Sequence, residues 1–289
     1  MAIRTILVPL DGSDASAAVL DTALVVANRF GAHIDALHVR QRPEDAAPYL
    51  FTHVSGKLRE SFIREAEKTE RDKAAAVRAQ FEEFCTRNAV QMVTGPTAGH
   101  GATAAWREEP GRAAEVLVRC ARLADVVAIA RPRTRPEVVR RSPIGQNLEA
   151  VMLGSGRPVL IVPPGWQAKR VEHAAIGWNE SLEASRALAM TMPWLEQMSA
   201  VTVIASGKRR KSAARLGEYL AWHGVEAKIR ILDQSSDSVG KSMLDTCAAI
   251  GAELLVVGGY SRARTRQLMF GGVTQHLLKH SNIITVMVH

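Results

Sequence analysis

Continuous apolar runs and amphipathic stretches alternate along the chain. The runs ILVPL (6–10), VVAIA (126–130) and PVLIV (158–162) are hydrophobic at nearly every position, which is typical of parallel strands that are covered on both faces. The stretches between such runs repeat apolar residues at helical spacing. Strands that alternate with helices in this way predict right-handed crossovers in an open α/β sheet.

The pattern predicts the same order of elements in both halves of the chain. In the first half we expect strands at 3–9, 33–39, 91–94, 125–130 and 158–163, and helices at 13–30, 56–88, 111–123 and 144–153. In the second half we expect strands at 173–178, 200–205, 226–232, 253–258 and 283–288, and helices at 181–195, 208–223, 237–250 and 272–280.

Three pairs of segments match one another across the two halves. They are 4–39 with 172–204, 123–130 with 251–259, and 145–162 with 271–288. A period of well over about 100 residues is longer than a solenoid repeat and indicates a duplicated domain. The segment PPGWQAKRVE (163–172) contains two prolines and a glycine after a strand, which marks a boundary. We therefore predict two doubly wound domains, 1–164 and 172–289, each a five-stranded parallel sheet with helices on both faces.

Length and cysteine content narrow the class of protein. A chain of 289 residues is long enough for two cores that need no disulfide. Cys85, Cys120 and Cys247 lie inside helical patterns, and so few cysteines favour a reducing compartment over a disulfide framework. The chain shows no signal-peptide pattern, and no apolar run approaches the roughly 20 residues that span a bilayer. We expect a cytoplasmic protein with no membrane partner.

The net charge of +8 is concentrated in three basic clusters, at 131–141, 208–211 and 262–266. Such clusters can meet phosphate groups. No aromatic residues interleave with the arginines, as a platform for single-stranded nucleic acid would require. We therefore expect no nucleic acid partner, and read the clusters first as solvated loops.

The chain resembles the universal stress protein family in its tandem bacterial form. The segments that carry the resemblance are ILVPLDGS (6–13), VVGGYS (256–261) followed by FGGVT (270–274), and the last apolar strand of each half. The family fold is an adenine nucleotide alpha hydrolase-like sheet, and many members bind ATP. In single-domain members the last strand forms the homodimer. The resemblance thus implies pairing of Val159–Val162 with Ile284–Val288 inside one chain, and a homodimer of the whole chain.

The resemblance also implies a nucleotide site in the second half. The family pattern is G-x-x-G, nine residues, then G and Ser or Thr around the phosphates, with an Asp after the first strand and backbone from the second strand at the nucleoside. Here Ser261 replaces the second glycine and Gly272 the hydroxyl residue, while Asn179 stands in place of the Asp. The residues implied to bind are Asn179, Ile204, Gly258, Ser261, Arg262, Gly271, Gly272 and Val273.

In the first half the opposite side of the pattern is kept. Asp11 and Val39 match the nucleoside side, whereas Ala130 replaces the first glycine and the following loop contains three prolines. Proline lacks the N–H donor from which a phosphate cradle is built, so a cradle there would need arginine. Asp11 has an alternative role in an Asx turn that precedes a helix capped by Ser13.

Three functions follow as hypotheses. The first is a non-catalytic stress regulator that binds ATP or AMP, with or without Mg, in its second half. The alternative is a nucleotide-free scaffold that acts through its surfaces. An enzyme is the third, limited to slow ATP hydrolysis because the glycine loop has no carboxylate or lysine for phosphoryl transfer. His276 and His280 lie four residues apart but lack the glutamate of a zinc motif, so no metal site is predicted.

Overall fold

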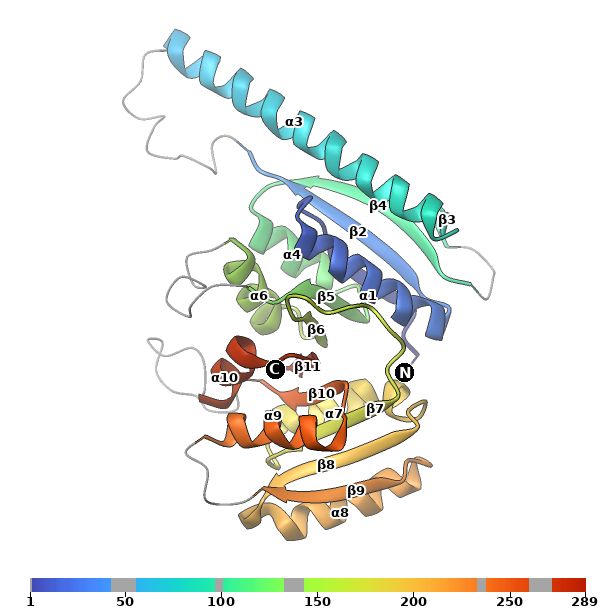
Figure 1. Cartoon of the computed structure of the whole chain (residues 1–289). Coiled ribbons are helices and arrows are strands. Elements are labelled where there is room, and N and C mark those ends of the chain that lie inside the picture. The colour runs from blue at the N-terminus through green and yellow to red at the C-terminus, as the bar shows by residue number, and fades with distance from the viewer. Residues whose placement is uncertain (1, 43–55, 97–100, 133–142, 233–237, 260–271) are drawn as a thin grey trace.

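The computed structural model describes residues 2–42, 56–96, 101–132, 143–232, 238–259 and 272–289. Within these residues a single sheet of eleven strands runs through the molecule, with helices on both of its faces (Figure 1). The predicted α/β class is confirmed. The two sheets that the sequence predicts are joined edge to edge into one.

The first half supplies six strands and four helices among the described residues. The strands are β1 (Thr5–Pro9), β2 (His33–Arg40), β3 (Gln91–Met92), β4 (Thr103–Pro110), β5 (Val126–Ala130) and β6 (Val159–Val162). The helices are α1 (Asp14–Phe30), α3 (Gly56–Arg87), α4 (Ala113–Ala121) and α6 (Pro143–Gly154). Helix α3 is much longer than the others, and only its part from Ala74 to Cys85 contributes buried side chains.

The second half supplies five strands in the described residues. They are β7 (His173–Trp178), β8 (Ala200–Ser206), β9 (Ala227–Leu232), β10 (Leu254–Gly258) and β11 (Ile284–Val288). The helices are α7 (Leu182–Leu195), the short 3-10 helix η2 (Gly207–Arg209), α8 (Arg210–Trp222), α9 (Val239–Ile250) and α10 (Gly272–His280).

The strand order is β3-β4-β2-β1-β5-β6-β11-β10-β7-β8-β9. Strands within each half are parallel, whereas β6 and β11 pair antiparallel, with Leu160 opposite Val286. This confirms the predicted pairing of the last strands inside one chain. Leu160 pairs with Ala128 of β5 as Val286 pairs with Val256 of β10, so an approximate two-fold axis passes between Leu160 and Val286.

Strand β4 is a correction to the sequence analysis, which predicted no element between residues 94 and 111. Its sequence TAAWREEP carries three charges, so the strand lacks the apolar run by which the others were found. In the fold Arg107 Nη2 donates to Asp35 Oδ2 of β2 at 2.5 Å, which gives a charged strand a partner inside the sheet. β4 takes the place beside β2, and the strand predicted at 91–94 is a two-residue edge strand.

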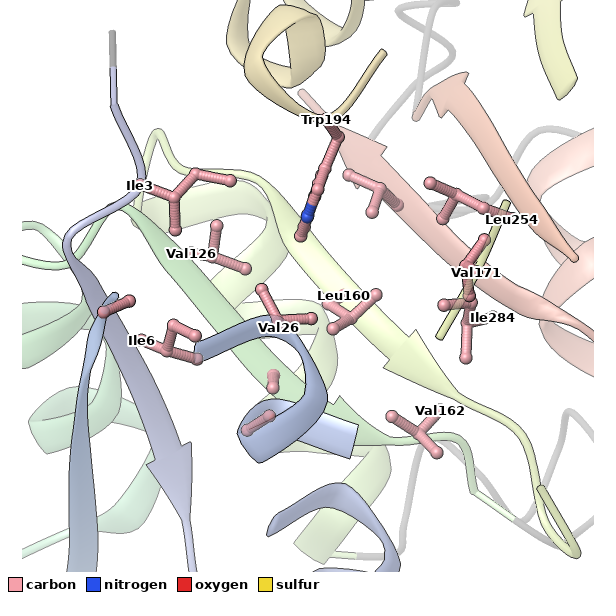
Figure 2. Packing of buried hydrophobic residues seen from close by; sticks show 14 of the residues in the cluster. Ile3, Ile6, Val26, Val126, Leu160, Val162, Val171, Trp194, Leu254 and Ile284 are labelled. Carbon is pink, nitrogen blue, oxygen red and sulfur yellow. The ribbon is translucent and has the colours of Figure 1, made fainter. Parts of the chain in front are cut away.

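The hydrophobic core is continuous across the seam between the halves. Trp194 of α7 packs with Val26 and Leu160 of the first half in one buried cluster (Figure 2), and its ring lies 6.2 Å from that of Phe30. Arg29 adds a polar tie, because its Nη1 donates to the carbonyl of Val171 at 2.6 Å. The halves are therefore packed against each other rather than linked by a tether. The boundaries at 164 and 172 stay a prediction.

Corresponding hydrogen bonds recur in the two halves. The backbone N–H of Arg4 donates to Asp125 Oδ2 at 2.8 Å, and the backbone N–H of Glu172 donates to Glu253 Oε2 at 2.9 Å. In both cases an acidic side chain just before a central strand, β5 or β10, accepts a hydrogen bond from the backbone just before the neighbouring strand, β1 or β7. The likeness of the halves thus extends from the order of elements to single contacts.

The three cysteines, which the sequence places inside helical patterns, are buried and unpaired. Burial raises the pKa of the Cys247 thiol to about 12, so this group stays protonated and unreactive at neutral pH. In the part of the chain that the structure describes, no helix combines the length and the apolar character needed to cross a bilayer.

Candidate functional site

The candidate site lies at the carboxyl edge of the sheet. A helix that connects two parallel strands runs back against them, so α1, α7 and α10 begin at this edge. The N-terminal turn of a helix has free N–H groups and a partial positive charge, which together favour anions. Open α/β sheets bind ligands where the strand order reverses. In the second half that point lies between β7 and β10.

Asp11 and Asn179 occupy the same position in the two halves. Ser13 donates to Asp11 Oδ1 through its backbone N–H at 2.9 Å and its hydroxyl at 2.6 Å, and the backbone N–H of Ser181 donates to Asn179 Oδ1 at 3.1 Å. Both residues therefore form Asx turns. The structural role anticipated for Asp11 is present, and its contact with a ligand stays a prediction.

The serines of these turns cap the helices that follow. The backbone N–H of Ser16 donates to Ser13 Oγ at 3.2 Å, and that of Ala184 donates to Ser181 Oγ at 3.2 Å. Burial raises the pKa of Asp11, but the hydrogen bonds from Ser13, with the charge of Lys73, outweigh it and hold the pKa below the usual 3.8. Asp11 thus stays ionised beside the start of α1.

The residue between turn and cap differs between the halves. Both positions have the left-handed backbone conformation, with φ at 82° for Gly12 and 64° for Glu180. Glycine adopts this conformation without strain, whereas another residue is held there at a cost of about 1 kcal/mol or more. Glu180 Oε2 accepts a hydrogen bond from Arg209 Nη1 at 2.5 Å, so an ion pair lies across the ends of β7 and β8.

Gly258 ends β10 in direct contact with the start of α7. A Cβ atom on Gly258 would lie 2.5 Å from the backbone nitrogen of Ala184 and 2.7 Å from the carbonyl carbon of Glu183. Only glycine allows this approach, which brings the first turn of α7 onto the end of the strand. The corresponding residue of the first half is Ala130, which carries a methyl group.

Gly259 and Gly272 differ in what surrounds them. The N–H of Gly259 donates to the carbonyl of Val288 at 2.7 Å, as the N–H of Arg131 donates to Val162 at 2.8 Å in the first half. This N–H is therefore used inside the sheet. A Cβ atom on Gly272 would meet no atom of the described residues within 4 Å. Gly272 is exposed and Val273 half-buried at the start of α10.

The two residues predicted to offer backbone to a nucleoside lie near the ends of the second strands. Val39 is half-buried one residue before the end of β2. Ile204 lies two residues before the end of β8, and its side chain is fully buried. The predicted binding residues Ser261, Arg262 and Gly271 lie outside the described residues.

The model of the universal stress protein family matches residues 2–163, which is more than half of the chain. This chain belongs to the universal stress protein family. No curated protein sequence matches it closely enough to count as a relative.

Solved structures of similar length share the fold. A universal stress protein from Archaeoglobus fulgidus is 16% identical, with a TM-score of 0.66, over 98% of this chain and 97% of that chain. A functionally unknown protein from Pseudomonas aeruginosa is 14% identical, with a TM-score of 0.59, over 99% of this chain and 92% of that chain. At such low identity the likeness shows the fold alone.

Arg131 has a different role from the one expected for its cluster. It lies in the cluster at 131–141, which the sequence analysis reads first as a solvated loop and in which a phosphate cradle would need arginine. In the structure its Nη1 donates to the carbonyl of Leu278 at 3.0 Å and to that of Lys279, so it binds the end of α10 in the other half. The remaining arginines of that cluster, Arg133, Arg135, Arg140 and Arg141, lie outside the described residues.

Three histidines of this family member, His38, His276 and His280, have structural surroundings. His38 is buried, its Nδ1 donates to the carbonyl of Leu10 at 2.8 Å, and its ring stacks on Trp106. The rings of His276 and His280 lie 4.5 Å apart. Among the described residues no three His, Cys, Asp or Glu side chains gather as metal ligands would.

Proposed function

We propose that the second half of this universal stress protein binds an adenine nucleotide, ATP or AMP, and that binding regulates a stress response without catalysis. The observation that supports this most directly is the contact of Gly258 with the first turn of α7. It places the positive end of a helix at the point where the strand order reverses. The start of α10 supplies a second helix N-terminus at the same edge, where no described residue comes within 4 Å of the Cβ position of Gly272.

The charges at this edge favour an anionic ligand. Lys208, Arg209, Arg210 and Lys211 follow β8 at the same edge, and Asn179 is neutral where the first half has Asp11. Oxygen and N–H groups of Asn179, with the backbone near Ile204, are suited to the nucleoside. We place the phosphates near Gly258, Gly272 and Val273, and extend the site to Ser261, Arg262 and Gly271 from the sequence pattern alone.

The first half is less suited to a nucleotide. Helix α3 covers its turn so closely that a Cβ atom on Gly12 would lie 2.8 Å from Val77 Cγ2, and Arg131 is engaged with α10. Asp11 and Val39 therefore keep the nucleoside side of a site whose phosphate side is occupied otherwise. One universal stress protein has been solved in complex with cAMP, but its TM-score of 0.33 to this chain is too low to carry the argument.

A non-catalytic role is favoured because the loop from 258 to 272 contains no Asp, Glu or Lys. Phosphoryl transfer needs such groups to hold magnesium or to position the nucleophile. The ligand would act by stabilising the half that binds it, by RT ln(1 + [L]/Kd). We propose Mg only as a companion of bound triphosphate, and a cytoplasmic location as the compartment where these nucleotides are available.

The experiment is thermal melting with and without millimolar ATP or AMP, each with and without Mg. We expect nucleotide to raise the melting temperature of the wild type. Gly272→Val should abolish this shift, because the branched side chain blocks the backbone N–H groups that start α10. Gly56→Val is the matched control, since Gly56 also begins a helix and also has nothing within 4 Å of its Cβ position. An unchanged melting temperature of the wild type would contradict the proposal.

The second candidate is a scaffold that binds partners, including a second copy of the chain, without nucleotide. It is favoured by β9, an edge strand of the sheet with Lys228, Ile229 and Arg230 exposed. Because β6 and β11 already pair with each other inside the chain, a homodimer would have to form through a different surface, such as the exposed edge at β9. Sedimentation of the wild type with and without nucleotide distinguishes the two candidate functions. A nucleotide-free scaffold should show the same degree of self-association in the presence and in the absence of nucleotide.

A further inference from the structure

Arg131 joins the two halves through one end of helix α10. It follows β5 in the first half, and its Nη1 donates to the carbonyls of Leu278, at 3.0 Å, and Lys279 in the second half. The last carbonyls of a helix have no partner inside it and carry partial negative charge. The guanidinium group of Arg131 donates hydrogen bonds to these carbonyls, and its positive charge is attracted to their partial negative charge. Burial lowers the pKa of Arg131, but guanidinium remains charged at neutral pH.

Helix α10 depends on such contacts because it is short. Nine residues are too few for a helix to be stable in isolation. Its buried side chains are Thr274 and Leu277, and His276 packs against α9 where a Cβ atom on Gly240 would lie 2.8 Å from His276 Cβ. The helix begins at Gly272 in the proposed nucleotide site. One end therefore faces the ligand and the other end is held by Arg131.

Among the described residues of the second half, no side chain makes the equivalent contact with the end of α6. The residue that corresponds to Arg131 is Gly259, which has no side chain, and its Cβ position is 3.1 Å from Met152 Cε of α6. The carbonyl of Gly154, at the end of α6, instead accepts a hydrogen bond at 3.2 Å from Arg122 Nε of its own half. In the described part of the chain, the contact at these two corresponding positions is therefore made only by the first half, through Arg131 and α10.

We propose that Arg131 is a positioning residue through which the first half controls nucleotide binding in the second half. By holding the end of α10, it keeps the N-terminal turn of that helix in place for the phosphates. Coupling between two sites is reciprocal, so bound nucleotide should also strengthen the contact of Arg131 with α10. This inference rests on the proposed function. The effect of Arg131 on the stability of α10 can nevertheless be measured without any ligand.

The first measurement is hydrogen exchange of the α10 amides in the nucleotide-free protein. Arg131→Met keeps the length of the side chain and removes its donors, while the backbone bond of residue 131 to Val162 remains. We expect exchange in α10 to become about tenfold faster in this variant and to be partly restored in Arg131→Lys. Arg122→Met is the control, and should affect the end of α6 only. Unchanged exchange in α10 of Arg131→Met would overturn the inference.

The second measurement is affinity for ATP and AMP by calorimetry. We expect Arg131→Met to weaken binding about five- to tenfold, within the usual range of coupling between sites, and Arg122→Met to leave it unchanged. Nucleotide should slow exchange at 278–280 in the wild type but not in Arg131→Met. Equal affinity of wild type and Arg131→Met would refute the coupling and leave the proposed function standing. No binding to the wild type would refute both the proposed function and the control of it by Arg131.

Discussion

The carboxyl edges of the two halves share one framework and differ in how it is filled. In the first half the long helix α3 lies over the turn at Gly12, and the central strand ends at Ala130, with Arg131 after it. In the second half α8 is short, Glu180 replaces the glycine of the turn, and the central strand ends at Gly258, with Gly259 after it. The hydrogen bonds of the Asx turns and of the serine caps are the same in both halves.

This difference shows which parts of a doubly wound sheet can change independently. The Asx turn and serine cap start a helix that each half needs for its core, and they are present in both. The end of the central strand, in contrast, differs between the halves. Gly258 ends β10 and admits the start of α7, whereas Ala130 ends β5 and is followed by Arg131, whose side chain binds the other half.

The largest effect is expected from exchanging glycine and alanine at the ends of β10 and β5. Gly258→Ala places a methyl group 2.5 Å from a backbone nitrogen, which cannot move without shifting α7, so we expect a loss of about 3 kcal/mol in the free energy of unfolding. Ala130→Gly should lose only about 0.7 kcal/mol, from the flexibility of glycine. Urea unfolding measures both. Equal losses would mean that the two strand ends are packed alike.

A smaller effect is expected from exchanging the residues of the two turns. Gly12→Glu puts a side chain on a residue with positive φ and brings its Cβ atom too close to Val77. We expect the free energy of unfolding to fall by about 2 kcal/mol. Glu180→Gly relieves the backbone strain at this position, which stabilises the fold. It also removes an exposed ion pair and makes the unfolded chain more flexible, which both destabilise the fold, so we expect the free energy of unfolding to change by no more than about 0.5 kcal/mol. Melting of the two variants provides the comparison. A strong loss in Glu180→Gly would show that the ion pair with Arg209 outweighs the strain.

The smallest effect concerns pH. The folded pKa of Asp11 lies below 3.8, so the ionised group contributes stability that is present above the unfolded pKa and is lost as the pH falls through the folded pKa. Asp11→Asn keeps the acceptor of the turn, as Asn179 does, and removes this titration. We expect the variant to be less stable than the wild type near neutral pH and equal to it in strong acid. A constant difference between them across the acid range, measured by urea unfolding, would contradict the assignment.

Much of the fold could be predicted because its strands are buried on both faces. ILVPL, VVAIA and PVLIV lie in or across β1, β5 and β6. The pairing of β6 with β11 inside one chain was implied by the family resemblance, and its antiparallel direction is seen only in the structure. β4 escaped prediction because Arg107 is balanced by Asp35, which lies 72 residues earlier in the chain. A local pattern does not contain the partner that makes a charged strand stable.

At the edge that holds the candidate site, only the local geometry could be predicted from the sequence. The turns at Asp11 and Asn179 form from neighbours two residues apart, so their geometry follows from local sequence. The role of Gly258 could not be derived in this way, because the atoms that require glycine belong to α7, over 70 residues earlier in the chain. Arg131 was misread for the same reason, since its acceptors lie 147 and 148 residues away.

The amino-acid sequence by itself determined the order of strands and helices apart from β4, the family and the likeness of the two halves, because periodicity and turn chemistry act over a few residues. Only the tertiary structure decided which glycine admits a helix, which arginine crosses the seam and which charged strand enters the sheet. These depend on atoms brought together from distant parts of the chain. Their energies come from packing and hydrogen bonding that exist only after the sheet has formed.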